Sequence, residues 1–99
     1  MNYRLHRAAV GEHYDNVAFY EERVPGLGAD YLADFDAVMA HIEAWPNFYP
    51  TFGDPHIRRA GLKRFPFHVI YRAEATQIIV LAISHHRRRP AYWLGRLPK

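Results

Sequence analysis

The sequence contains no cysteine, so neither a disulfide nor a thiolate metal site contributes to its stability. With 99 residues, of which 49% are hydrophobic, the chain can still bury one core, and we expect a single domain over residues 1–99. No stretch approaches the ~18 apolar residues of a membrane span, and residues 1–6 lack the apolar segment of a secretory leader. Together with the lack of cysteine, this predicts a soluble cytoplasmic protein without membrane contact.

The sequence also lacks the motifs of common cofactor and metal sites. It has no glycine-rich phosphate loop, no HExxH pattern, and no Ser, His and Asp set with informative spacing. Its seven histidines are scattered, and the adjacent His85 and His86 would point to opposite faces of a strand. We predict that the protein uses no metal and no cofactor.

Negative charge is scarce in the second half of the chain. Residues 51–99 carry ten basic and two acidic side chains, a balance of +8, whereas residues 1–50 have a balance of −5. This asymmetry favours a polyanion or an acidic protein as the partner of the second half. An ordinary solvated basic surface explains the composition equally well.

The hydrophobic pattern predicts an α+β domain. Apolar residues alternate near the N-terminus, as in a strand, and then recur every three or four residues in two helical segments separated by Pro25, Gly26 and Gly28. We expect an N-terminal strand and an antiparallel helical hairpin packed on one face of a largely antiparallel sheet of three to four strands. The expected elements are a strand at 3–5, helices at 8–24 and 30–45, a loop at 47–55, strands at 57–60, 65–72 and 78–83, and a short C-terminal tail.

The last expected strand leads into a cationic, aromatic tail. Residues 78–83 are all apolar, which indicates a strand covered on both faces, and Pro90 prevents that strand from continuing. Three basic side chains would therefore lie at the strand end: Arg87, Arg88 and Arg89. They could bind phosphates or the carboxylates of a partner protein, while a solvated charge run is the alternative. Tyr92 and Trp93 could stack on a nucleobase or anchor the tail on the core.

A second basic group is expected on one face of the strand at 65–72. Alternation with the aromatic residues of that strand would turn Arg64, His68 and Arg72 toward the face away from the helices. A histidine between two arginines could hold a phosphodiester, because guanidinium groups match phosphate and histidine titrates near neutrality. The alternative is the ordinary polar outer face of an antiparallel strand.

Three segments of the sequence resemble the RelE/ParE superfamily of bacterial type II toxins. They are "AFYEERVPGLGADYLADFDAVMAHIEAWP" at 18–46, "IRRAGLKRFPFHVIYR" at 57–72, and "IIVLAISHHRRRPAYWLGR" at 78–96. The resemblance covers roughly residues 3–96, and the tail pattern H-x-R-R-x-P-x-Y-W is typical of the ParE-like branch. The fold of that superfamily agrees with the order of elements expected from the hydrophobic pattern.

The resemblance implies a growth-inhibiting toxin, of the kind found in plasmid stabilization systems, that a cognate antitoxin neutralises. ParE-like members act on DNA gyrase by binding, with Arg64, Arg72, Trp93 and the three tail arginines as candidate contacts here. RelE-like members instead cut mRNA on the ribosome without a metal. In that case His68 or His86 would be the acid or base, Arg88 would stabilise the phosphorane, and Tyr92 would stack or deprotonate. His68 stands where RelE-like toxins tend to carry an arginine, which favours the ParE-like branch. An inert descendant that retains antitoxin binding is the third possibility.

Overall fold

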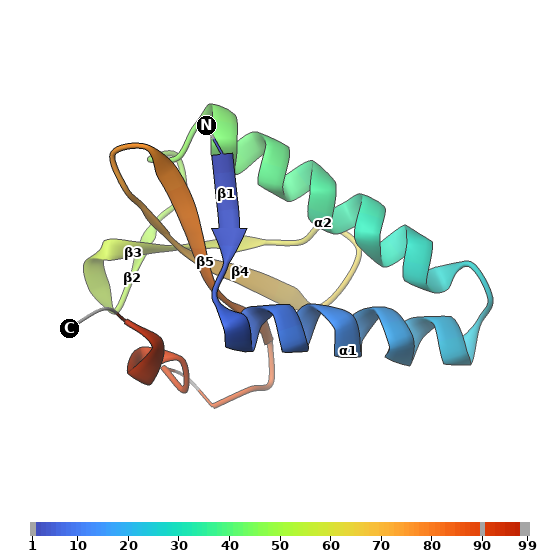
Figure 1. Ribbon diagram of the computed structural model, residues 1–99. Coiled ribbons are helices and arrows are strands. Elements are labelled where there is room, and N and C mark those ends of the chain that lie inside the picture. The colour runs from blue at the N-terminus through green and yellow to red at the C-terminus, as the bar shows by residue number, and fades with distance from the viewer. Residues whose placement is uncertain (1, 90, 98–99) are drawn as a thin grey trace.

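The computed structural model describes residues 2–89 and 91–97 and shows a sheet of five strands with two helices (Figure 1). The sheet order is β1-β5-β4-β3-β2, in which β1 runs parallel to β5 and all other pairs are antiparallel. The elements are β1 (Asn2–Leu5), α1 (Arg7–Arg23), α2 (Leu27–Ala44), β2 (Thr51–Phe52), β3 (Asp54–Gly61), β4 (Phe67–Ala73), β5 (Gln77–His85) and the 3-10 turn η1 (Leu94–Arg96).

The expected α+β architecture and its order of elements are confirmed, but the sheet has one strand more than predicted. The additional strand, β2, lies within the segment 47–55 that was expected to be a loop. Two residues are too few to show a hydrophobic period, so the pattern gave no signal for it. Among the described residues, no helix is long and apolar enough to cross a membrane. Pro90, which was expected to stop the last strand, lies outside the described residues, and β5 ends at His85.

The helical hairpin turns at Gly26, whose φ of 90° lies in the left-handed region that favours glycine. The carboxylate of Glu21 accepts hydrogen bonds from the backbone N–H groups of Gly26 and Gly28. At Gly28 the two helices approach closely, because a Cβ there would lie 3.0 Å from the carbonyl oxygen of Val17. The hairpin therefore depends on glycine at two positions for two different reasons.

Both faces of the sheet are covered, as the apolar run of the last strand predicted. The helices pack on one face, where Ile78, Val80 and Ile83 of β5 join the main core. On the other face Ile79, Leu81 and Ala82 pack with Trp93 of the C-terminal segment, which lies below the strands in Figure 1. A bulge makes this division possible. Ile70 pairs with Ala82 and Tyr71 with Val80, so β5 has one extra residue, Leu81, between them.

The connection from β3 to β4 departs from the prediction at Arg64. The strand β4 begins at Phe67 rather than 65, and the buried carboxylate of Asp34 in α2 accepts the backbone N–H groups of Lys63, Arg64 and Phe65. The Arg64 side chain lies on the helix side, 3.6 Å from Asp30. The prediction that Arg64 shares the open face with His68 was therefore wrong.

Candidate functional site

Two histidines meet where β4 begins and β5 ends. His68 of β4 pairs with Ser84 of β5, and the ring of His86 lies just beyond the strand with its centroid 4.2 Å from that of His68. The two rings line a cavity of about 90 Å³ together with Arg59 and Arg88. We call this cavity the histidine pocket. It brings together four of the predicted site residues, His68, His86, Arg88 and Trp93, from segments separated by up to 25 positions.

The ring of His85 points away from that of His86, as strand alternation predicted, although His85 is also among the residues that line the histidine pocket. Its ring packs edge-on against Phe67 with centroids 5.2 Å apart, on the side where the helices lie, and its Nδ1 accepts the backbone N–H of Arg87. The two adjacent histidines thus follow different directions. Within residues 2–89 and 91–97 no group of three or more His, Cys, Asp or Glu side chains is arranged to hold a metal ion.

The surroundings of His68 keep its imidazole neutral. Burial, together with the nearby His86 and Arg59, which disfavour a further positive charge, lowers the pKa of His68 to about 4. A histidine with this pKa is unprotonated at neutral pH and accepts a proton poorly. Since acid and base catalysis is most efficient when the pKa lies near the working pH, His68 is better suited to hydrogen bonding than to proton transfer.

The basic run at the strand end is exposed. Arg87, Arg88 and Arg89 all face solvent, and among the described residues no carboxylate lies within 4.0 Å of their guanidinium groups. The guanidinium of Arg88 stacks over the ring of Tyr92 at 4.0 Å from its centroid. A stacked guanidinium keeps its edge donors available, so Arg88 is both fixed in place and free to bind an anion.

Tyr92 is fixed from its other end by Glu12 of α1. Its hydroxyl donates to Oε2 of Glu12 at 2.6 Å, and burial together with this carboxylate raises the pKa of Tyr92 to about 12. The guanidinium of Arg96 donates to both oxygens of Glu12, at 2.9 and 3.1 Å. Tyr92 therefore stays protonated at neutral pH and acts as the support on which Arg88 rests.

Trp93 belongs to the second core, although it is also among the residues that line the histidine pocket. It is 1% exposed and packs with Ile57 and Ile70, while Phe52 lies 6.1 Å away between ring centroids. A side chain this deeply buried cannot stack on a base without leaving the core. Of the two roles predicted for Trp93, the structure supports anchoring of the C-terminal segment and not contact with a target.

Arg72 is on the expected face but away from the histidine pocket. It lines a second cavity, which lies beside β1. Neither His68 nor His86 lines that cavity. Two other residues of this region, Arg59 and Glu12, were not predicted from the sequence. Arg59 stacks over Phe52 at 4.3 Å and pairs across the sheet with Ile70, so only the register of β3 and β4 places it near His68. The role of Glu12 could not be predicted from the sequence, because nothing distinguishes it from the other acidic residues of the helix.

The comparisons with known proteins bear on the fold. No family model matches the sequence, and no curated protein matches it. A chain from the solved structure "Chromosomal ParDE TA system from P. aeruginosa" matches with a TM-score of 0.72 and 19% sequence identity. The match covers 86% of this chain and 95% of that one. The two chains thus share the α+β fold over nearly their whole length, which confirms the fold that the sequence resemblance implied.

Proposed function

We propose that this chain is the toxin component of a type II toxin–antitoxin system, belongs to the RelE/ParE superfamily, and is neutralised by a cognate antitoxin. The observation that carries the proposal is the shared fold with a chain of the P. aeruginosa ParDE system, at a TM-score of 0.72 over 86% of the residues. The tail pattern from His85 to Trp93, which is typical of ParE-like toxins, points the same way.

The target we favour is DNA gyrase, bound through the basic end of β5. Three exposed arginines at the end of a rigid strand form a surface that a protein or nucleic acid can contact without rearrangement of the fold. Arg88 is held over Tyr92, which reduces the side-chain entropy lost on binding. A mode of action by binding requires no proton transfer, and the low pKa of His68 and the Tyr92–Glu12 hydrogen bond are compatible with it.

Ribosome-dependent mRNA cleavage is the second candidate, and one observation favours it. His68 and His86 contact each other in a cavity that Arg59 and Arg88 also line, a combination that could bind a phosphodiester. In this scheme His86 would transfer protons, since His68 has a pKa of about 4. Tyr92 would contribute its ring and not a phenolate, because its pKa of about 12 keeps it protonated.

The antitoxin we expect is acidic and partly disordered before it binds. Residues 51–99 have a charge balance of +8, so an antitoxin rich in carboxylates would be attracted to them. An antitoxin segment that folds on binding can cover a large surface. The test is titration of the purified chain with the product of the adjacent small reading frame. We expect submicromolar affinity that weakens as salt rises. Absence of binding at low salt would remove the antitoxin part of the proposal.

A further inference from the structure

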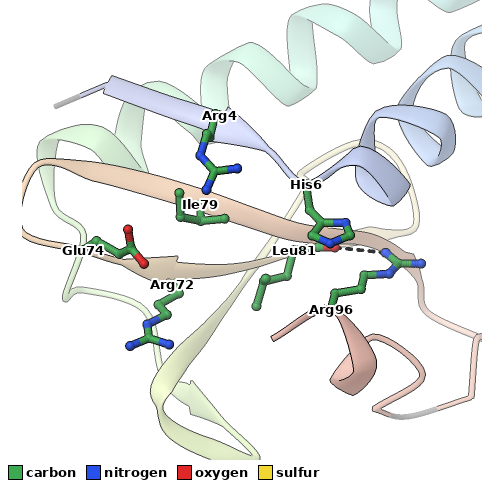
Figure 2. Close-up of a pocket in the computed structure, with 7 residues that line it drawn as sticks. All are labelled: Arg4, His6, Arg72, Glu74, Ile79, Leu81 and Arg96. Atoms are coloured by element: carbon green, nitrogen blue, oxygen red, sulfur yellow. Dashed lines mark hydrogen bonds between the residues drawn. The ribbon is translucent and has the colours of Figure 1, made fainter. Parts of the chain in front are cut away.

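A second cavity, of about 180 Å³, lies on the same face of the sheet as the C-terminal turn but beside β1 (Figure 2). We call it the β1 pocket. Ile79 and Leu81 of β5 form its apolar base and are 6% and 1% exposed. Arg4 of β1 and Arg72 of β4 border it from the two strands that flank β5. The β1 pocket shares no lining residue with the histidine pocket.

The third arginine at the β1 pocket is already neutralised. Figure 2 shows Arg96 reaching from the C-terminal turn to the carbonyl oxygen of Leu81, a hydrogen bond of 2.9 Å. Its guanidinium also forms the ion pair with Glu12 at 2.9 Å. Arg96 therefore lines one end of the pocket, and because it is paired with Glu12 it adds little net charge there.

The other two arginines are not neutralised in this way. Among the described residues, no carboxylate lies within 4.0 Å of the guanidinium of Arg4 or Arg72, although Glu74 borders the same pocket. His6 adds a donor, because its Nδ1 accepts the backbone N–H of Ala8 and the neutral ring then carries its proton on Nε2. The polar border thus has two guanidinium groups and an imidazole N–H against one carboxylate.

We propose that the β1 pocket binds a small organic anion, one ring in size, that carries a phosphate or carboxylate group. An apolar cavity of about 150 Å³ in another protein holds benzene, so the space over Ile79 and Leu81 accommodates a single ring. Guanidinium groups form charge-assisted, paired hydrogen bonds with phosphates and carboxylates alike, so Arg4 and Arg72 select the anionic group. This site goes beyond toxin action and does not depend on it.

The test is an NMR titration of the full chain, in which the isoleucine and leucine methyl groups are isotope-labelled. The probes are phenyl phosphate, benzoate and inorganic phosphate, each at constant ionic strength. We expect saturable shifts of the Ile79 and Leu81 methyl signals with the two ring-bearing anions, and binding about tenfold weaker or more for inorganic phosphate, which lacks the apolar group. The stronger of the two ring-bearing probes identifies the preferred anionic group.

Variants decide whether the arginines are responsible. Arg4→Gln and Arg72→Gln should each weaken phenyl phosphate binding about tenfold or more, and Arg4→Lys should weaken it less because the charge remains. Arg23→Gln removes the same charge at the far end of α1 and should leave binding unchanged. Methyl shifts that increase linearly with probe, or that persist unchanged in Arg4→Gln and Arg72→Gln, would overturn the proposal. Growth assays play no part in this test, so its outcome is independent of the proposed function.

Discussion

The carboxylate of Glu12 is bound by the guanidinium of Arg96 at 2.9 and 3.1 Å, although the two residues are 84 positions apart. The same carboxylate accepts the Tyr92 hydroxyl at 2.6 Å and the backbone N–H of Ile83 at 3.0 Å. One side chain of α1 thus joins the bulged part of β5 to the C-terminal turn. The position of Arg88, which stacks on Tyr92, depends on this connection.

We predict that Glu12→Gln lowers the free energy of unfolding by about 2 to 3 kcal/mol, because it leaves a largely buried guanidinium without its counter-charge. Urea denaturation followed by circular dichroism measures the change. The matched control is Glu22→Gln on the exposed face of the same helix, which should change stability by less than about 0.5 kcal/mol. Equal effects of the two substitutions would show that the Glu12 cluster adds nothing beyond general surface charge.

The pKa of His68 predicts a pH dependence of stability. Folding lowers this pKa from about 6.5 to about 4, so the unfolded chain takes up the proton first as the pH falls. Stability is therefore complete above pH 6.5, decreases between about pH 6.5 and 4, and decreases no further from this group below pH 4. Because the ring is only partly buried, we expect a loss of about 1 to 2 kcal/mol between pH 7 and pH 5.

The His68→Gln variant isolates this contribution. Glutamine cannot be protonated, so the variant should lose less stability than the wild type over the same pH interval. Burial also lowers the pKa of His13, and that contribution is present in both proteins and cancels in the comparison. Thermal unfolding at pH 7 and pH 5 is the measurement. If wild type and variant lose the same amount of stability, the pKa of His68 does not differ between the folded and the unfolded chain.

His68→Gln also tests whether His68 itself acts as a catalytic acid or base, a role that the nuclease scheme above gives to His86. If the protein acts by binding, the variant loses at most one hydrogen bond, which corresponds to a two- to tenfold weakening for about 0.5 to 1.5 kcal/mol. If His68 were a catalytic acid or base, its loss would slow cleavage by about 10² to 10⁴-fold. We expect growth arrest to persist in the variant when expression is titrated. Abolition of arrest, together with ribosome-dependent mRNA cleavage by the wild type, would favour the nuclease.

The sequence predicted well those features that depend on local periodicity. It placed the helical hairpin, the two-sided burial of β5, and the opposite directions of His85 and His86, because each follows from the period of a single element. It failed where tertiary contacts decide. Asp34 binds the backbone ahead of β4 and thereby turns Arg64 to the helix side, and nothing in the local pattern marks that carboxylate.

The candidate site was predictable only in part for the same reason. Residues of β4 and of the strand end were found, because both are basic interruptions of apolar strands. Arg59 lines the histidine pocket because of the register between β3 and β4. Glu12 does not line it but holds Tyr92 and Arg96, which lie 80 and 84 positions away in the sequence. Trp93 was predicted as a contact because an aromatic residue next to arginines is typical of binding surfaces. The structure buries it in the core, which its neighbours in the sequence did not indicate.

The tail arginines are predicted to carry the interaction with the target. Replacing Arg88 and Arg89 together with alanine should relieve growth arrest while the melting temperature stays nearly unchanged, because exposed substitutions shift stability by less than about 0.5 kcal/mol. The control, Arg7→Ala with Arg23→Ala, removes the same charge from exposed positions on α1. Full toxicity of the Arg88 and Arg89 variant would make these side chains ordinary solvated surface.

The most direct test of the central claim is pulse labelling after induction of this chain in bacteria without the proposed antitoxin. Labelled thymidine and labelled methionine are given at short intervals, so that DNA and protein synthesis are followed in the same culture. A toxin that binds gyrase should arrest growth with thymidine incorporation falling first and methionine incorporation later. An immediate fall in methionine incorporation, or continued growth with both rates unchanged, would contradict the account.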